Sequence, residues 1–88
     1  MPLRISFNPR AWDDYQYWQQ TDKQKLKKIN AIINDICRHP FEGIGKPEPL
    51  RHQQSGYWSR RIDGEHRLVY EVLDNVVSIM ACRYHYHP

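Results

Sequence analysis

Residues 57–72 constrain the fold of this chain more than any other stretch. Two runs rich in aromatic and β-branched residues flank Asp63-Gly64, a pattern that predicts a β-hairpin. A two-residue turn at Asp63-Gly64 would place Arg60 opposite Arg67 and would mix apolar with charged side chains on both faces. A three-residue loop over 62–64, with Gly64 in the left-handed conformation, separates them better. We predict this second register, because a one-residue slip would undo the separation.

The chosen register gives the hairpin one mainly apolar and one mainly polar face. The apolar face holds Trp58, Arg60, His66, Leu68, Tyr70 and Val72, and the polar face holds Tyr57, Ser59, Arg61, Glu65, Arg67, Val69 and Glu71. Arg61 and Arg67 therefore share an open polar face, where two guanidinium groups repel each other unless an anion lies between them. Two solvated surface arginines are the alternative interpretation.

The residues before the hairpin predict one strand and two helices. Leu3, Ile5 and Phe7 alternate with polar residues, and Asn8-Pro9 has the form of a helix N-cap followed by proline. The first helix is predicted to bury Ala11, Trp12, Tyr15 and Trp18. Thr21 to Gln24 has the form of a capping box, and a second helix, with an apolar stripe from Leu26 to Ile36, should end near His39, because Pro40 follows.

A final strand should follow the turn at Asp74-Asn75, with Val77, Ile79 and Ala81 on the apolar face of the sheet. The element order is then β-α-α-β-β-β. We predict one α+β domain over residues 1–88, with an antiparallel sheet and two N-terminal helices packed on one of its faces. Strict alternation would place Tyr86 on the face of Arg67 and His85 on the opposite face. Bringing both to Arg67 would require a bulge or an irregular strand end.

The composition narrows the classes of function. The net charge of +3 and pI of about 9.0 permit a nucleic-acid partner without requiring one. No apolar run is long enough to span a bilayer and no signal-peptide pattern is present, so we expect a cytoplasmic protein without membrane association. Cys37 and Cys82 are then expected to be reduced core residues.

Several reactive side chains could meet on the polar face. Glu48 stands between Pro47 and Pro49, which present it stiffly. An acid, arginines and a histidine suit cleavage of RNA by its own 2′-hydroxyl. Glu48 would then be the base, Arg67 with Arg61 would hold the phosphorane, His85 would be the acid, and Tyr86 would stack on a base or orient the phosphate. The alternative is a zinc site with His85 and His87 as ligands, and it fits less well because no metal-binding motif is present.

Many short segments of the chain together resemble the YoeB toxins, the Txe/YoeB branch of the RelE superfamily of bacterial toxin–antitoxin systems. The matching segments, which cover nearly the whole chain in order, include Trp12-Asp13-Asp14-Tyr15, Pro40-Phe41-Glu42-Gly43, Gly45-Lys46-Pro47-Glu48-Pro49-Leu50, Ser59-Arg60-Arg61-Ile62, Glu65-His66-Arg67-Leu68-Val69-Tyr70 and Ala81-Cys82-Arg83-Tyr84-His85-Tyr86. The resemblance implies a microbial-ribonuclease-like fold and a metal-independent, cofactor-free endoribonuclease that cuts mRNA in the A site of the 70S ribosome. It also implies a YefM-type antitoxin partner, a homodimer, and operator DNA binding through the antitoxin complex alone.

The same resemblance assigns roles to individual residues. The general base falls on Glu48, the phosphate-stabilising arginine on Arg67 and the terminal pair on His85 and Tyr86. Supporting substrate contacts fall on Lys46, Arg51 and Arg61; Arg51 stands where relatives often have lysine. The chain also continues past the family's usual terminal tyrosine with His87-Pro88. A non-cleaving module that binds the ribosome or the antitoxin is the alternative function, and a DNA-binding repressor acting alone fits less well, since no helix-turn-helix spacing is present.

Overall fold

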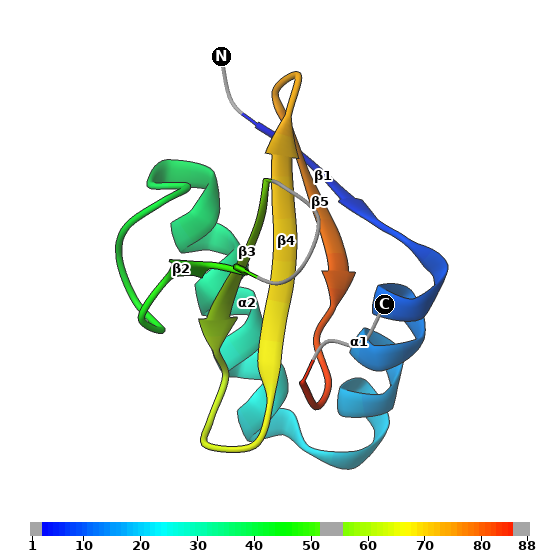
Figure 1. The fold of residues 1–88 in the computed structure, drawn as a ribbon. Coiled ribbons are helices and arrows are strands. Elements are labelled where there is room, and N and C mark those ends of the chain that lie inside the picture. The colour runs from blue at the N-terminus through cyan, green and yellow to red at the C-terminus, as the bar shows by residue number, and fades with distance from the viewer. Residues whose placement is uncertain (1–2, 52–55, 86–88) are drawn as a thin grey trace.

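The computed structural model describes residues 3–51 and 56–85, which form two helices and one five-stranded sheet. The helices are α1 (Pro9–Thr21) and α2 (Lys23–Arg38). The strands are β1 (Arg4–Phe7), β2 (Glu48–Pro49), β3 (Tyr57–Arg61), β4 (Arg67–Leu73) and β5 (Val76–Ala81), in the sheet order β1-β5-β4-β3-β2. Figure 1 shows α2 running behind the strands, so that the sheet has one helix-covered face and one face that we call the outer face.

The predicted α+β class and the two N-terminal helices are confirmed, and the sheet differs from the prediction in two respects. A two-residue strand, β2, precedes the hairpin and pairs with β3. In addition, β1 runs parallel to β5, so the sheet is mixed rather than antiparallel. A parallel pair needs a long crossover connection, which the two helices and the hairpin supply here. None of the helices in the described part of the chain is long and apolar enough to cross a membrane.

The helix ends follow the predicted capping chemistry, with one correction. Asn8 caps α1 by accepting the N–H of Ala11 at 2.8 Å. The predicted capping box is displaced by one residue: Asp22, not Thr21, caps α2 and accepts the N–H groups of Gln24 and Lys25. Thr21 still belongs to α1, and its hydroxyl donates to the carbonyl of Tyr17. As expected, α2 ends at Arg38, with His39 as its C-cap.

The hydrophobic core lies between the helices and one face of the sheet. It contains Ala11 and Trp18 from α1, Ile29, Ile32, Ile33 and Ile36 from α2, and Leu68, Tyr70, Val77 and Ile79 from the sheet. Trp12 was predicted to be buried, but its side chain is 45% exposed. It lies at the edge of α1, where it stacks on Tyr15 and meets Phe7 edge to face.

The hairpin has the predicted faces but a longer loop. Arg61 pairs with Arg67, and Trp58 pairs with Tyr70, so the parity of the chosen register is confirmed. The loop covers residues 62–66 rather than 62–64, and Gly64 is not in the left-handed conformation. The carboxylate of Asp63 explains the difference, because it accepts the N–H groups of Glu65 and His66 and closes the loop without a left-handed glycine.

Candidate active site

Backbone register brings three of the predicted site residues onto the outer face. Arg61 of β3 lies directly opposite Arg67 of β4, and Glu48 of β2 lies directly opposite Ser59 of β3. Directly opposed residues point to the same face, and so do residues two apart on one strand. Glu48 is therefore a diagonal neighbour of Arg61, a position whose backbone separation is roughly 7–8 Å in an antiparallel sheet, with the Cβ atoms somewhat closer.

The two arginines form the closer of the two kinds of antiparallel pair. The N–H of Arg61 donates to the carbonyl of Gly45 at 2.7 Å, and the N–H of Arg67 donates to the carbonyl of Tyr84 at 3.0 Å. Neither N–H points at the opposing strand, which is the pattern of a non-hydrogen-bonded pair, with Cα atoms about 4.5 Å apart. Like charges directly opposite each other destabilise a sheet, so this pair is electrostatically suited to an anion.

The guanidinium of Arg67 is held against the hairpin loop. Its Nη1 donates to the carbonyl of Asp63 at 2.8 Å and to the carbonyl of His66 at 3.1 Å. A guanidinium carries five N–H donors, and among the described residues only Nη1 is engaged, which leaves the Nε and Nη2 edge as a two-donor fork. That fork matches the oxygens of a phosphate in a bidentate arrangement.

The hairpin loop is in turn tied to α2. Lys25 Nζ lies 2.6 Å from the Asp63 carboxylate. Burial alone would raise the pKa of Asp63, but the bond from Lys25 and the N–H groups of His66 and Glu65 outweigh it and lower that pKa to about 2. Asp63 is therefore an anion near neutral pH, and its carboxylate and its carbonyl both help to fix the surroundings of Arg67.

The loop before β2 is organised by Arg60, the other arginine of the hairpin. Arg60 is fully buried on the helix-covered face, where its guanidinium pairs with Asp35 of α2. It also donates to the carbonyls of His39, Glu42 and Ile44 and to the hydroxyl of Tyr70. This loop leads directly to Lys46 and Glu48, so a buried arginine determines where the predicted base is presented.

Gly45 is the point at which this loop meets β3. A Cβ atom at this position would lie 3.0 Å from the carbonyl oxygen of Arg61 and 3.1 Å from the Cβ of Arg60, and its φ of +80° is in the left-handed range. Only glycine allows this close approach without strain, and the approach permits the bond from the N–H of Arg61.

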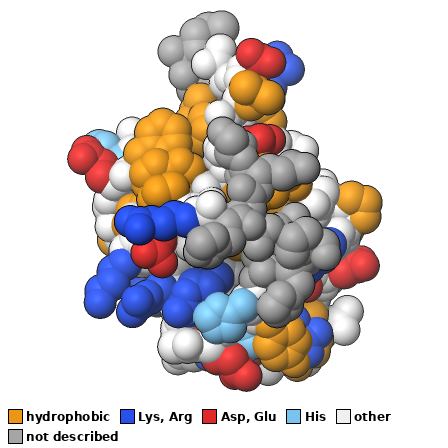
Figure 2. All heavy atoms as spheres, viewed as in Figure 1, with side chains coloured by type: hydrophobic (Ala, Val, Ile, Leu, Met, Phe, Trp, Pro, Cys, Tyr) orange, Lys and Arg blue, Asp and Glu red, His pale blue; other side chains and the backbone are white. Residues whose placement is uncertain are grey.

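The remaining predicted substrate contacts lie beside this pair. Lys46 and Glu48 are exposed, as are Arg51 and Arg61, whereas Arg67 is partly buried. Within residues 3–51 and 56–85, no side-chain ion pair engages any of these five residues. Figure 2 shows lysine and arginine side chains gathered on one side of the outer face, with an acidic side chain among them.

The centre of the outer face is less open than predicted. Ser59, Val69 and Ala81 form a row across β3, β4 and β5 that ends beside Glu48, and their exposed fractions are only 4%, 1% and 1%. The charged groups therefore lie beside a floor of small side chains.

The end of β5 departs from regular alternation, in agreement with the irregular strand end that we expected near His85. A bulge occurs where Val69 pairs with Ala81 while Tyr70 pairs with Ile79. It turns Cys82 into the core, where a core cysteine was expected, and it moves Ala81 from the predicted apolar face to the outer face opposite Val69. The peptide between Tyr84 and His85 then lies against Arg67, since the Tyr84 carbonyl accepts the N–H of Arg67. His85 is exposed, whereas Tyr86 lies outside the described residues.

Sequence reasoning missed the side chains that hold this strand end. Trp18 Nε1 donates to the carbonyl of Cys82 at 2.8 Å, and Asp14 accepts the N–H of Cys82 at 3.0 Å. Burial raises the pKa of Asp14, although the bond from Cys82 opposes that shift. His66 Nδ1 accepts the N–H of Tyr84 at 2.7 Å. The sequence pattern predicted that Trp18 is buried and that His66 lies on the apolar face, but it did not indicate that either side chain binds this strand end.

Two other features of the surface do not suit catalysis. In the described part of the chain, no three potential metal-ligating side chains lie together; His52 and His87 fall outside it.

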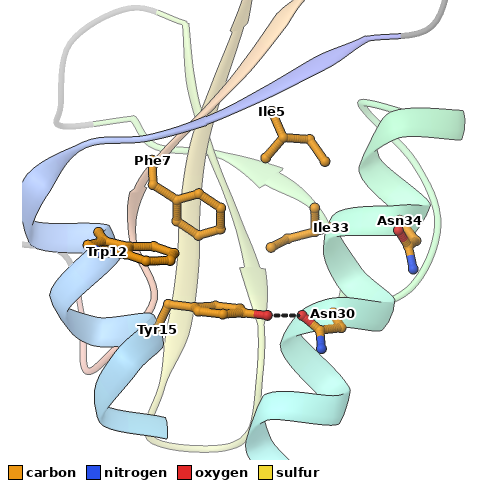
Figure 3. A pocket seen from close by; sticks show the side chains of 7 residues that line it. All are labelled: Ile5, Phe7, Trp12, Tyr15, Asn30, Ile33 and Asn34. Atoms are coloured by element: carbon orange, nitrogen blue, oxygen red, sulfur yellow. Dashed lines mark hydrogen bonds between the residues drawn. The ribbon is translucent and has the colours of Figure 1, made fainter. Parts of the chain in front are cut away.

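An apolar hollow of about 520 Å³ opens between β1 and the helices (Figure 3). It is lined by Ile5, Phe7, Trp12, Tyr15, Asn30, Ile33 and Asn34. Tyr15 donates to Asn30 within it, and the hollow brings no acid–base pair together.

Comparisons with known proteins agree with the resemblance in the sequence. Residues 7–86 match the family described as the YoeB-like toxin of bacterial type II toxin–antitoxin systems. The chain is 61% identical to Toxin YoeB of Escherichia coli O6:H1 over 84 residues, which are 96% of this chain and 100% of that protein. The YoeB dimer of Staphylococcus aureus superposes with a TM-score of 0.91 at 53% identity, covering 98% of this chain and 100% of that one. A chain of the heterotetrameric YoeB–YefM toxin–antitoxin complex from the same organism superposes with a TM-score of 0.87, at the same identity and coverage.

Proposed function

Because this chain belongs to the YoeB-like toxins of bacterial type II toxin–antitoxin systems, we propose that it is a ribosome-dependent mRNA endonuclease. It would cut mRNA in the ribosomal A site and so inhibit translation. The observation that carries this proposal is the opposed pair Arg61 and Arg67, with Glu48 on the same face. The two arginines, which repel each other, suit the binding of a phosphate group. The nearby carboxylate suits removal of a proton.

The proposed reaction uses the 2′-hydroxyl of the RNA as the nucleophile. Glu48 removes the 2′-proton while the 2′-oxygen attacks the neighbouring phosphorus. The Nε and Nη2 edge of Arg67, with Arg61 opposite, stabilises the charge that develops on the phosphorane. The bond from phosphorus to the 5′-oxygen breaks, and His85 protonates that oxygen. The products are a 2′,3′-cyclic phosphate and a 5′-hydroxyl, and the reaction needs neither a metal nor a cofactor.

The other site residues would bind the substrate. Lys46 and Arg51, both exposed beside β2, would contact the RNA backbone. Tyr86 would stack on a base or orient the phosphate.

The partners follow from the relatives. Structures of Staphylococcus aureus YoeB include a dimer and complexes with YefM. We propose that this chain likewise forms a homodimer and binds a YefM-type antitoxin, and that it reaches operator DNA only through that complex. A cytoplasmic location would be required for access to ribosomes.

The test is primer extension on a translated reporter mRNA. Wild type should leave discrete cuts within codons at the A site, and Glu48→Gln and Arg67→Ala should each abolish them in folded protein. Glu71→Gln is the matched control, because Glu71 lies on the same face but opposite Tyr57, and it should cut like wild type. Cleavage should persist when EDTA removes transition metals such as zinc, with magnesium in excess over EDTA so that the ribosomes stay intact. Translation arrest without cuts would instead support a non-cleaving module that binds the ribosome.

A further inference from the structure

We propose that His66 is a positioning residue for this reaction, which holds the peptide before His85 against Arg67 without touching the RNA. This inference rests on the proposed function. Its basis is that two consecutive residues hold both polar backbone atoms of Tyr84. His66 Nδ1 accepts the N–H of Tyr84 at 2.7 Å, and the N–H of Arg67 donates to the carbonyl of Tyr84 at 3.0 Å.

The conformation of Tyr84 explains why such a hold is needed. Its φ of +60° is left-handed, a strained conformation for a residue with a Cβ atom. Strands alternate their side chains, and one left-handed residue breaks that alternation directly before His85. If the bond to His66 were lost, the Tyr84 N–H would have no partner to hold it. The backbone strain at Tyr84 would then favour an extended conformation. The direction of the chain at His85 would then change.

His66 is itself fixed in place. Its side chain is almost fully buried, and its ring meets Trp18 edge to face at 4.8 Å between centroids. Because Nδ1 accepts a hydrogen bond, the neutral imidazole carries its proton on Nε2, which lies 3.3 Å from a carboxylate oxygen of Glu65. The ring of Tyr84 also packs against the His66 ring, with centroids 5.1 Å apart.

The same burial excludes a direct catalytic role for His66. Its relative exposure is 5%, and Nδ1 is occupied by a backbone N–H. His85, by contrast, is exposed and follows the held residue directly. The two histidines thus have different roles in the proposal: His66 orients the backbone, and His85 transfers the proton.

Two substitutions of His66 separate positioning from packing. Asparagine can place its amide oxygen close to the position of Nδ1, whereas the longer glutamine places its amide near Nε2. Both remove the ring that contacts Trp18, so both should lose stability in urea denaturation, and His66→Gln should lose somewhat more because it also lacks the bond to Tyr84. We expect single-turnover cleavage on programmed ribosomes to fall about 100-fold in His66→Gln, through the rate constant rather than ribosome affinity. His66→Asn should recover most of that loss.

A second measurement follows the backbone directly. In the inactive Glu48→Gln background, the Tyr84 amide should be protected from hydrogen exchange and should stay protected when His66→Asn is added. It should lose protection when His66→Gln is added. Equal cleavage by the two His66 variants, or an unprotected Tyr84 amide in the Glu48→Gln parent, would overturn the proposal. A wild type that arrests translation without cutting mRNA would instead overturn the proposed function, whatever the exchange data show.

Discussion

Arg60 and Arg61 are consecutive residues of β3 with opposite environments, and we predict opposite effects for the same substitution. Arg60 is fully buried on the helix-covered face, and Arg61 is exposed on the outer face. Methionine is unbranched, and it removes the charge at either position. Arg60→Met should strongly destabilise the fold, whereas Arg61→Met should leave stability nearly unchanged and reduce activity.

The size of the Arg60 effect follows from its partners. The substitution leaves the Asp35 carboxylate and three carbonyls of the loop after α2 without their donor. Removing one partner of a buried ion pair costs about 3–5 kcal/mol. We expect the lower end, about 3 kcal/mol, because the Asp35 side chain retains 22% exposure and can regain some water. A chain of this size has roughly 4–13 kcal/mol of stability, and the melting temperature should fall by about 12–24 °C.

The expected effect of Arg61→Met on stability is close to zero or slightly stabilising. Exposed substitutions usually change stability by less than about 0.5 kcal/mol. Arg61 also lies opposite Arg67, and relieving repulsion between opposed like charges can stabilise a sheet by up to about 1 kcal/mol. Arg61→Met should therefore unfold at the same urea concentration as the parent protein, or at a slightly higher one.

Urea and thermal denaturation followed by circular dichroism measure both effects. Each substitution is placed in a Glu48→Gln background, so that toxicity does not limit expression. Asp35→Asn provides the second half of a double-mutant cycle with Arg60→Met, and their coupling should be at least about 1 kcal/mol. A loss below about 1 kcal/mol for Arg60→Met would refute the reasoning, and so would an equal loss for Arg61→Met.

Three further predictions concern acid, thiol reactivity and salt. The pKa of Asp63 is lowered from 3.8 to about 2, so its stabilisation is complete above about pH 4 and is lost as the pH falls toward 2; Asp63→Asn should flatten urea stability over that range. Burial, with a smaller contribution from Asp14, raises the pKa of Cys82 to about 12, and burial also raises that of Cys37. At pH 8, Cys37 of the folded protein should therefore react slowly with an alkylating agent, and Cys82 should react only after the protein unfolds. Mass spectrometry of peptides would measure both reactions. Arg61→Met should reduce the salt dependence of ribosome binding by about one unit of log–log slope, and an unchanged slope would argue against a phosphate contact there.

The outer-face arginines were predictable because β-sheet parity is a strong constraint. One register of the hairpin separated apolar from polar side chains, and the observed pairing of Arg61 with Arg67 keeps that parity. The length of the loop was not predictable in the same way. Asp63 closes it with its carboxylate, and the expected left-handed Gly64 is not needed. Local side-chain bonds of this kind leave no periodic signal in the sequence.

The placement of His85 shows where sequence patterns stop being informative. Strict alternation placed it on the face opposite Arg67, and the strand end instead contains a bulge and a left-handed Tyr84 that no sequence pattern located. The bonds that hold this segment come from His66 and Trp18, which are 18 and 64 residues away from their partners in sequence. Such side-chain-to-backbone contacts depend on the finished fold, so neither periodicity nor turn chemistry predicts them.

Three polar side chains away from the proposed chemistry support three of the proposed catalytic residues. Arg60 organises the loop that leads to Glu48, Lys25 holds the loop whose carbonyls bind Arg67, and His66 holds the residue before His85. Each supported residue lies on or beside an irregular segment, namely a loop, a hairpin end or a bulged strand. Irregular backbone is adaptable in position but has few regular hydrogen bonds to fix it, whereas proton transfer and charge stabilisation require accurate distances. A small domain can meet both demands if long polar side chains from the helices and neighbouring strands bind the carbonyls, N–H groups and carboxylates of those segments. Substitution of such a support should therefore lower the rate of cleavage while leaving the phosphate-binding charges in place.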